Sequence, residues 1–332
     1  MTREVEALGL KAKQVVGGAE VEGPEGSYEV CNLWLRIASR VQLKIAELKS
    51  PAQLTQLNVS NWVAQGGPVS FEVSGHRAHE WKSAAARKWP LPSGAETPAQ
   101  VLIRDVDGVC TVSIDTSGTP LYQRGARQEV GKAPMRETLA AGVLSLCGYD
   151  GTTPLWDIMC GSGTLVIEAA EISRGLAPGR MREFAFERFP SHDRQRWQGR
   201  AKVRPAVGAH TVKGTDLNAG ALGVARRNAR RAGVGEFMTL ERVDATKLPV
   251  PAGPPGLIVA NVPYGKRVGE AGELSALFKA VGSSLKQSCA GWRYGVLTNS
   301  EVTAFGLPIS GHADVSNGGL RCSVIWGEIP KR

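Results

Sequence analysis

From about residue 133 to the C-terminus, short apolar segments alternate with longer segments of helical periodicity. Strands are expected at residues 155–159, 209–214, 238–240, 257–260, 294–297 and 322–326, and helices at 134–147, 162–172, 218–232 and 274–285. Parallel strands need a crossover connection, usually a helix, so strict alternation favours parallel pairing. The pattern predicts an α/β fold with a mostly parallel sheet covered by helices on both faces.

The region before about residue 118 has a different pattern of expected strands and helices. Strands are expected at 69–73 and within 99–114, on either side of a helix over 77–88. The Asp107-Gly108 pair inside the second segment predicts a tight hairpin turn. Residues 42–48 are interpreted as helix, followed by Pro51. The long charged segment 174–205 is interpreted as an elaborated connection within the second region.

Charge is distributed unevenly along the 332 residues, whose formal net charge is +9. Residues 1–120 hold 12 lysines and arginines against 13 acids, whereas residues 121–332 hold 28 against 18. A basic excess favours a polyanionic partner such as a nucleic acid. The excess lies mainly in 174–204 and in the run 226–231, although such a run can also be a solvated helix face.

Several classes of protein are disfavoured by what the sequence lacks. No window approaches the roughly 18 consecutive apolar residues of a membrane span, and the first ten residues have no signal-peptide pattern. We therefore expect a cytoplasmic protein. The six cysteines show no Cys-x-x-Cys spacing, which favours reduced core thiols. His76 and His79 have no nearby ligand partners, so no metal site is expected.

The strongest local motif follows the strand at 155–159. An acid, Asp157, precedes Cys160, and a Gly-x-Gly turn then leads directly into a helix. Glycines let the backbone approach a ligand closely, and a helix N-terminus attracts an anionic group. An acid beside a helix N-terminus suits a cofactor with an amino-acid end, such as S-adenosylmethionine (SAM). A purely structural strand–turn–helix is the alternative. The residues of the turn are Gly161, Ser162, Gly163 and Thr164.

Acids also follow the next two strands. Asp216, with Leu217 after it, stands where an acid can bind the two hydroxyls of a ribose. Asp244, followed by Ala245, could accept a hydrogen bond from an adenine amino group. Asp216 alone could be a helix N-cap, and each acid is unspecific by itself, but three acids at successive strand ends favour a nucleoside-containing ligand.

A fourth motif, Asn261-Val262-Pro263-Tyr264, ends the strand at 257–260, and Arg267 follows it. The exocyclic amine of a base is a poor nucleophile, because its lone pair is delocalised into the ring. An Asn oxygen and a backbone carbonyl can accept its two hydrogens, and an aromatic ring can stack on an extruded base. The motif therefore predicts amine chemistry on a nucleobase, although Asn-x-Pro-Tyr is also a common turn.

With these motifs, the stretch Leu121-Tyr122-Gln123-Arg124-Gly125-Ala126-Arg127 and the stretch Lys132-Ala133-Pro134-Met135-Arg136-Glu137-Thr138-Leu139 closely resemble THUMP-domain RNA guanine-N2 methyltransferases. The resemblance covers nearly the whole chain. Residues 32–41, 183–188 and 316–320 also match family signatures, and 60–116 match the THUMP domain more loosely. The family consists of class I SAM-dependent enzymes that act on large-subunit ribosomal RNA or tRNA.

The resemblance implies a Rossmann-like catalytic domain with a mostly parallel seven-stranded sheet, preceded by α+β domains. The implied domains are a ferredoxin-like domain over 1–58, a THUMP domain over 59–118, a linker over 119–132 and the catalytic domain over 133–332. The first would be trimmed, because the chain starts about one strand later than family members usually do. Neither a second methyltransferase domain after the first nor an oligomer is expected.

The resemblance also implies roles for individual residues. SAM would be held by Pro134, Thr138, Asp157, Cys160, Gly161, Ser162, Gly163, Thr164, Asp216, Leu217, Asp244, Ala245 and Asn261. The target base would be held by Asn261, Pro263 and Tyr264. Independently of the resemblance, the distribution of basic charge makes these residues the candidates for contact with RNA: Arg77, Lys82, Arg87, Lys88, Arg124, Arg127, Arg226, Arg230 and Arg267. Val262 replaces the first proline of the family's usual Asn-Pro-Pro-Tyr, at the position that mainly presents a carbonyl.

The expected activity is methylation of the N2 amine of a guanosine in 23S ribosomal RNA or tRNA. Two alternatives stay open at this point. Asn-x-Pro-Tyr chemistry serves any exocyclic amine, so the enzyme could be an adenine-N6 methyltransferase on RNA or DNA. The chain could also be a non-catalytic RNA-binding or ribosome assembly factor.

Overall fold

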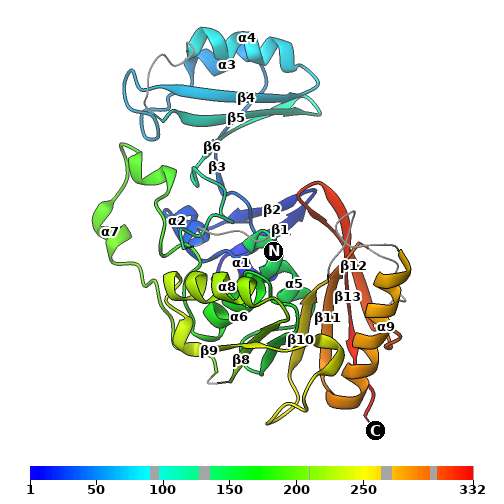
Figure 1. The fold of residues 1–332 in the computed structure, drawn as a ribbon. Helices are drawn as coiled ribbons and strands as arrows, with labels where there is room; N and C mark the ends of the chain where they lie inside the picture. The colour runs from blue at the N-terminus through cyan, green and yellow to red at the C-terminus, as the bar shows by residue number, and fades with distance from the viewer. Residues whose placement is uncertain (90–96, 127–134, 209, 263–270, 300–304, 332) are drawn as a thin grey trace. The chain divides into compact units, whose positions relative to one another are not determined.

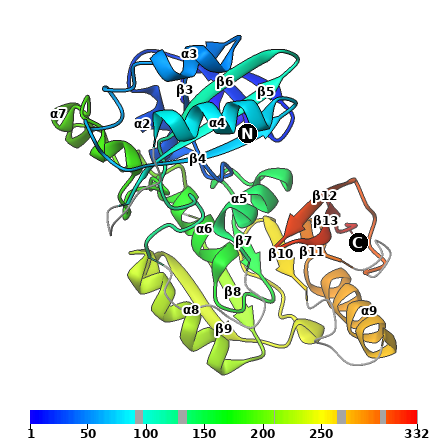
Figure 2. The same cartoon turned by 90° about the horizontal axis from the view of Figure 1, so that it is seen from above.

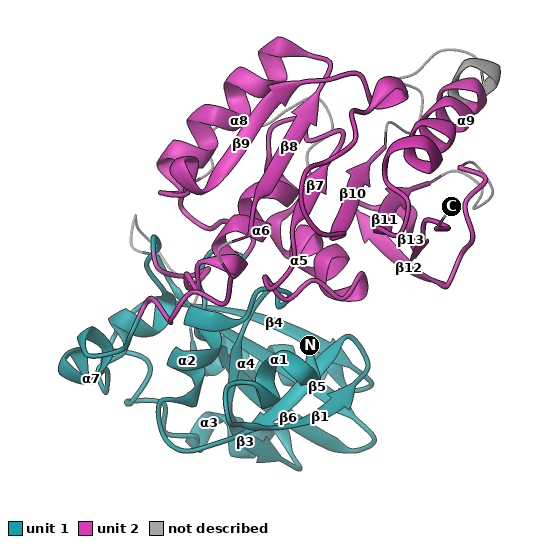
Figure 3. Cartoon of the chain, turned by 90° about the horizontal axis from the view of Figure 1, so that it is seen from below, with its two compact units in different colours: residues 1–121, 181–201 teal, residues 122–180, 202–332 magenta. Residues whose placement is uncertain are grey.

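The computed structural model describes residues 1–89, 97–126, 135–208, 210–262, 271–299 and 305–331 (Figure 1). The chain forms two compact units, which Figure 3 colours separately. Unit 1 comprises residues 1–121 together with 181–201, and unit 2 comprises 122–180 and 202–332. The second region therefore contributes one segment, 181–201, to the first unit. The domain boundaries at 58/59 and 118/119 stay predictions.

Unit 2 contains a seven-stranded sheet in the order β12-β13-β11-β10-β7-β8-β9. Strands β9, β8, β7, β10 and β11 run parallel, and β13 is antiparallel to both of its neighbours. The strands are β7 (Leu155–Asp157), β8 (Val212–Asp216), β9 (Met238–Arg242), β10 (Leu257–Asn261), β11 (Arg293–Thr298), β12 (Gly311–Asn317) and β13 (Leu320–Glu328). The predicted mostly parallel, seven-stranded α/β sheet is confirmed.

Helices cover both faces of this sheet, as the alternation along β10 shows. Leu257 and Val259 pack into a core cluster with one set of helices, and Ile258 and Ala260 pack into the cluster on the opposite face. The first face carries α5 (Glu137–Leu146), α6 (Thr164–Ser173) and α8 (Ala219–Arg231). The second carries α9 (Ala271–Ser288), which Figure 2 shows on the other side of β10 and β11. Short 3-10 helices are η2 (Gly235–Phe237) and η3 (Ala245–Lys247).

Strand β12 had no counterpart among the segments expected from the sequence. Its exposed positions are polar, and the intervening ones are mostly small, so its apolar signal is weak. It lies at the edge of the sheet and pairs only with β13, where little apolar surface is needed.

Unit 1 is built around a four-stranded sheet in the order β3-β6-β5-β4, next to a β1–β2 hairpin. The expected hairpin is confirmed: Asp107 and Gly108 both have positive φ, as a type I′ turn requires. The elements of unit 1 are α1 (Thr2–Glu6), β1 (Lys11–Val15), β2 (Gly18–Glu22), α2 (Ser27–Trp34), β3 (Gln42–Leu48), α3 (Pro51–Gln56), β4 (Val69–Gly75), α4 (Ala78–Lys88), β5 (Ala99–Val106), β6 (Val109–Asp115), η1 (Ala185–Arg188) and α7 (Arg194–Gln198).

The helix expected over residues 42–48 is wrong, because this segment is strand β3. It pairs antiparallel with β6, and the register shifts between Lys44 and Ala46. A bulge inserts one residue and shifts the alternation of side chains. The apolar residues at 43, 45, 46 and 48 therefore mimic helical spacing in a strand.

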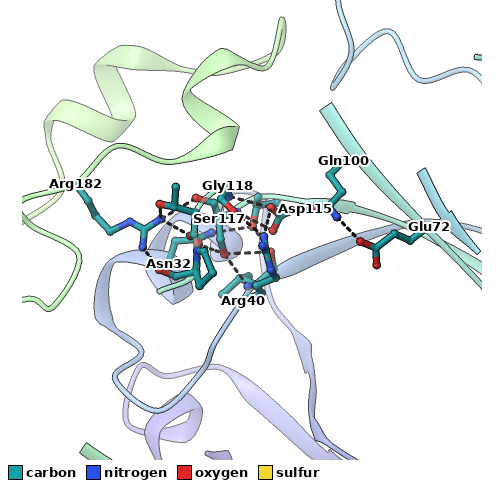
Figure 4. Close-up of polar contacts among 12 residues, drawn as sticks. Asn32, Arg40, Glu72, Gln100, Asp115, Ser117, Gly118 and Arg182 are labelled. Carbon is teal, nitrogen blue, oxygen red and sulfur yellow. Dashed lines mark hydrogen bonds and ion pairs between the residues drawn. The ribbon is translucent and has the colours of Figure 1, made fainter. Parts of the chain in front are cut away.

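Polar side chains tie α2 to the end of β6. Asn32 donates to Thr116 Oγ1 at 2.8 Å and accepts from Ser117 Oγ at 2.7 Å, and both bonds are buried (Figure 4). Next to them, Arg40 pairs with the buried carboxylate of Asp115 at 2.8 Å. Arg182, from the later segment, donates to the Ser117 and Pro120 carbonyl oxygens at 3.0 and 2.7 Å.

The segment 181–201 is joined to α2 by charge. The Glu29 side chain is 0% exposed and accepts from Arg196 Nη2 at 2.8 Å and from Arg200 Nε at 2.7 Å. Close by, the rings of Phe186 and Trp197 meet edge to face at 5.0 Å. A buried carboxylate needs such partners, so the N-terminal unit depends on arginines that lie 167 and 171 residues after Glu29 in the sequence.

Glu29→Gln should destabilise the protein by about 3–5 kcal/mol, because it leaves two guanidinium groups beside an uncharged partner. Glu25→Gln is the matched control. Glu25 also pairs with Arg196, at 3.4 Å, but its side chain is 86% exposed. Its loss should cost less than about 1 kcal/mol. Urea unfolding of both variants measures the difference, and equal losses would contradict the structural role given to Glu29.

Candidate functional site

Three polar residues end neighbouring parallel strands of unit 2. Asp157 at the end of β7 is level with Gly214 in β8 and with Val259 in β10. Asp216 and Asn261 therefore lie two residues further along the same edge. Asp244 follows the end of β9, the next strand in the sheet. The structure thus brings together the predicted acids and Asn261 at the carboxyl edge, where ligands bind in folds of this kind.

The turn after β7 has the positive φ values that its two glycines permit. Gly161 and Gly163 have φ values of 53° and 90°, and Gly163 N donates to Cys160 O at 2.8 Å. A Cβ on Gly161 would meet no atom within 4 Å, whereas one on Gly163 would lie 3.1 Å from Ala225 Cβ. Gly161 therefore leaves open space beside the turn, and Gly163 allows α8 to pack against it.

Asp216 holds this turn in place. Its Oδ2 accepts from Gly161 N at 2.9 Å, and its Oδ1 accepts from Asn218 N at 2.8 Å. Asn218 in turn caps α8 by accepting from the Gly220 and Ala221 amides. Leu217, between them, has 58% of its surface exposed. An acid with spare lone pairs beside an exposed apolar side chain suits the sugar and base of a nucleoside.

Asp157 is the most perturbed acid of the site. Its residue is 1% exposed, and its Oδ1 accepts from Met159 N at 3.2 Å. Burial raises the pKa of this carboxyl to about 8, and the charge of Asp216 contributes in the same direction. The protein alone therefore holds Asp157 largely protonated at neutral pH, and a bound cation would favour its ionised form.

Asp244 behaves in the opposite way. Its Oδ1 accepts from Thr246 N at 2.9 Å and from Thr246 Oγ1 at 2.7 Å, and these bonds hold its pKa below the usual value. It caps η3, and the adjacent Ala245 is buried. Asp244 thus caps a short helix in the structure, and its role toward a ligand stays a prediction.

Asn261 carries an unusual buried atom. Its side-chain Oδ1 is buried, and no described residue donates a hydrogen bond to it. An unsatisfied buried acceptor costs about 1–3 kcal/mol and therefore needs an explanation, and a ligand or substrate that donates to it is one. The following residue, Val262, is buried and donates from its backbone N to Leu297 O at 3.2 Å. The backbone that presents Asn261 is therefore tied to β11.

Other predicted site residues have mixed outcomes. Thr138 is buried on α5, and Cys160 is buried where the turn begins. Cys160 and the other five cysteines are buried, as expected of core thiols. Five predicted residues lie outside the described part of the chain: Arg127, Pro134, Pro263, Tyr264 and Arg267.

The prediction that Arg124 contacts RNA is corrected by the structure. Its side chain is 6% exposed, and Nη2 lies 3.5 Å from Oε1 of Glu168, which is also buried. A guanidinium enclosed in this way cannot reach a phosphate. The sequence could not show this, because the pair joins residues 44 positions apart.

Some of the remaining basic candidates are exposed to solvent, and others are bonded to groups of the protein itself. Lys82, Arg87 and Arg230 are exposed. Arg77 pairs with buried Asp105 at 2.8 Å, and Lys88 donates to the Thr55 and Leu57 carbonyl oxygens. Arg226 is exposed and donates to Leu240 O at 2.9 Å. The helix run 226–231 is thus only in part a solvated face.

One side chain in contact with the turn was not expected. Asn228 of α8 is buried and donates from Nδ2 to Ser162 O at 3.1 Å. No local motif marks it, because its partner lies 66 residues earlier. Among the described residues, no cluster of His, Cys, Asp or Glu could hold a metal ion, and no helix is long and apolar enough to cross a membrane.

Strand order, the antiparallel β13 and the glycine turn after β7 together define a class I methyltransferase fold. The chain belongs to the family described as the RMKL-like methyltransferase domain, whose model matches residues 124–306. A second model, the RlmL ferredoxin-like domain, matches residues 1–42.

Individual proteins resemble the chain over most of its length. A ribosomal RNA large subunit methyltransferase K/L from Psychromonas ingrahamii is 34% identical over 96% of this chain and 47% of its own. The solved methyltransferase SMU.472, complexed with S-adenosylhomocysteine, is 25% identical over 99% of this chain and 94% of its own, with a TM-score of 0.80. A protein named as a predicted N6-adenine-specific DNA methylase from Listeria monocytogenes is 26% identical over 99% of this chain and 92% of its own, with a TM-score of 0.82. The chain spans about half the length of the curated relatives it matches.

The raised pKa of Asp157 predicts a pH-dependent stability difference. In the cofactor-free protein the carboxyl stays protonated up to about pH 8, whereas in the unfolded chain it ionises near pH 4. Stability is therefore lost as the pH rises from about 4 to about 8. Asn is neutral throughout, so Asp157→Asn should melt about 5 °C or more above wild type at pH 8, with the gap closing toward pH 4.

Asp150→Asn is the control of opposite sign. Hydrogen bonds from Thr152 hold the pKa of Asp150 below its usual value, so its ionised form stabilises the fold above pH 4. Its replacement should lower the melting temperature slightly at neutral pH. Differential scanning calorimetry between pH 4 and 8 measures both variants. A wild-type protein that melts above Asp157→Asn at pH 8 would show that Asp157 is ionised in the fold.

Proposed function

We propose that this protein transfers a methyl group from SAM to the exocyclic N2 amine of a guanosine in RNA, with large-subunit ribosomal RNA as the favoured substrate and tRNA as the alternative. The observation that carries the proposal is the buried Oδ1 of Asn261 at the carboxyl end of β10, to which no described residue donates a hydrogen bond. The methyltransferase family of the chain and the names of its long relatives support the chemistry and the RNA class.

The residues of the carboxyl edge fit SAM. Gly161 leaves space for its methionine end, and the N-terminus of α6 favours its carboxylate. Asp157, neutral in the protein alone, would ionise beside its ammonium group. Asp216 and Leu217 would take the ribose, and Asp244 with Ala245 the adenine. The turn residues Cys160, Ser162, Gly163 and Thr164 would complete the pocket, with Thr138 and Pro134 from the α5 region.

SAM supplies a methyl group on a sulfonium, which is already a good electrophile. The protein therefore has to position the amine and accept its hydrogens as positive charge develops on nitrogen. Asn261 Oδ1 would accept one hydrogen, and the Val262 carbonyl the other. Pro263 and Tyr264 would hold the base, Tyr264 by stacking on its ring.

RNA binding would draw on basic residues of each unit. In unit 1 these residues lie on or next to α4: Arg77, Lys82, Arg87 and Lys88. In unit 2, Arg226 and Arg230 lie on α8. Arg127 and Arg267 would add to these contacts. We assign the ferredoxin-like fold to 1–58, the THUMP fold to 59–118, a linker to 119–132 and catalysis to 133–332, and we expect the enzyme to act as a monomer.

Adenine-N6 methylation is the second candidate, because one similar solved structure is named for that reaction. The two share the amine chemistry and differ in the base. Digestion of methylated RNA to nucleosides, followed by mass spectrometry, separates N2-methylguanosine from N6-methyladenosine. Detection of the adenine product alone would overturn the guanine assignment.

Asn261→Ala should lower the rate of methylation about 10²-fold or more, the scale seen when one preorganised polar group is removed. SAM and RNA affinities should stay close to wild type, because the oxygen acts on the amine in the transition state. Single-turnover methylation at saturating SAM and RNA measures the effect. Wild-type turnover by this variant would place the active site elsewhere.

RNA affinity should fall steeply with salt if these basic residues contact phosphates. Arg226→Glu combined with Arg230→Glu should weaken RNA binding and flatten the salt dependence, with SAM affinity unchanged. The matched control is Lys279→Glu with Lys286→Glu, the same change of charge on exposed positions of α9. Filter binding between 50 and 200 mM salt, a range in which about 10³-fold losses are typical for several contacts, measures both. Equal weakening by both pairs would mean that only net charge matters.

A further inference from the structure

The glycine turn is supported from α8 by a side chain that the proposed function does not use. Asn228 is 2% exposed, and its Nδ2 donates to the carbonyl oxygen of Ser162 at 3.1 Å. Ser162 lies between the two glycines. The peptide plane that joins it to Gly163 is thus held at both ends, because Gly163 N donates to Cys160 O at 2.8 Å.

Packing places Asn228 where this bond can act. Ala225 lies three residues earlier on the same face of α8 and is 0% exposed. A Cβ on Gly163 would come within 3.1 Å of Ala225 Cβ and 3.2 Å of Ile167 Cδ1. Helix α8 therefore lies directly against the turn. Because the Asn228 amide is buried, water does not compete for its hydrogen bond to Ser162.

The orientation of the amide is itself determined. Arg231 Nη1 donates to Asn228 Oδ1 at 3.3 Å. A guanidinium has only donors, so it selects the oxygen of the amide and turns the NH₂ group toward Ser162. An arginine of the basic run thus supports the turn through Asn228.

We propose that Asn228, oriented by Arg231, is a positioning residue of the cofactor turn. It holds the Ser162–Gly163 peptide in the geometry that presents the turn and the start of α6 to the amino-acid end of SAM. This inference rests on the proposed function, because it takes the turn to be part of the cofactor site. Without the bond, the cofactor has to order the turn as it binds, which weakens affinity.

The test is titration calorimetry with S-adenosylhomocysteine (SAH), well below the melting temperature of each variant. Asn228→Asp keeps the shape but loses the donor, and Asn228→Ala removes the amide. Each should weaken SAH binding about tenfold, the scale of one hydrogen bond. RNA affinity should be unchanged. Tyr294→Phe is the control, because it also removes one side-chain donor to a backbone carbonyl in unit 2, Tyr294 OH to Pro308 O at 2.8 Å. It should leave SAH affinity unchanged.

A double-mutant cycle separates positioning from general stability. Arg231→Met should weaken SAH binding severalfold in the wild-type background and have no effect in the Asn228→Ala background, because it acts through the amide. SAH affinities that are unchanged in Asn228→Asp and Asn228→Ala would overturn the inference. Failure of the unsubstituted protein to bind SAH would instead overturn the proposed function.

Discussion

The candidate site depends on one constraint, the parallel register of β8, β7 and β10. Because Asp157 is level with Gly214 and Val259, the chain leaves these three strands at one edge. Asp216, Asn261 and the glycine turn meet there, and Asp216 bonds directly to the turn through Gly161 N. A shift of one strand by one residue would turn its terminal side chain to the other face of the sheet.

Around this edge the protein combines satisfied and unsatisfied polar groups. Asp216 accepts two backbone amides, and Asp244 accepts the amide and hydroxyl of Thr246. Asp157 and Asn261, in contrast, are buried with little or no compensation among the described residues. The first two fix local geometry, whereas the second two would gain most from a bound cation and a bound amine. The four residues thus differ in how much hydrogen bonding the fold itself already supplies to them.

Buried charges have a different role in unit 1. Glu29 is enclosed by Arg196 and Arg200, and Asp115 by Arg40, at positions where no chemistry is expected. These pairs join segments distant in sequence, and the pair at Glu29 incorporates residues 181–201 into the unit. The charged, Trp-containing segment that resembled a mere connection is therefore part of the N-terminal fold.

The sequence by itself determined the alternation of strands and helices in unit 2, the glycine turn, the hairpin at Asp107-Gly108 and the acids at the strand ends. These features are local, since periodicity, backbone freedom and turn chemistry act over a few residues. Tertiary structure alone decided that residues 42–48 form a bulged strand, that 181–201 join unit 1, that Arg124 is enclosed with Glu168 and that Asn228 supports Ser162. Each depends on a partner distant in sequence, and side-chain hydrogen bonds and burial are set by that partner. An arginine available to a phosphate and one buried against a glutamate look the same until the fold supplies their neighbours.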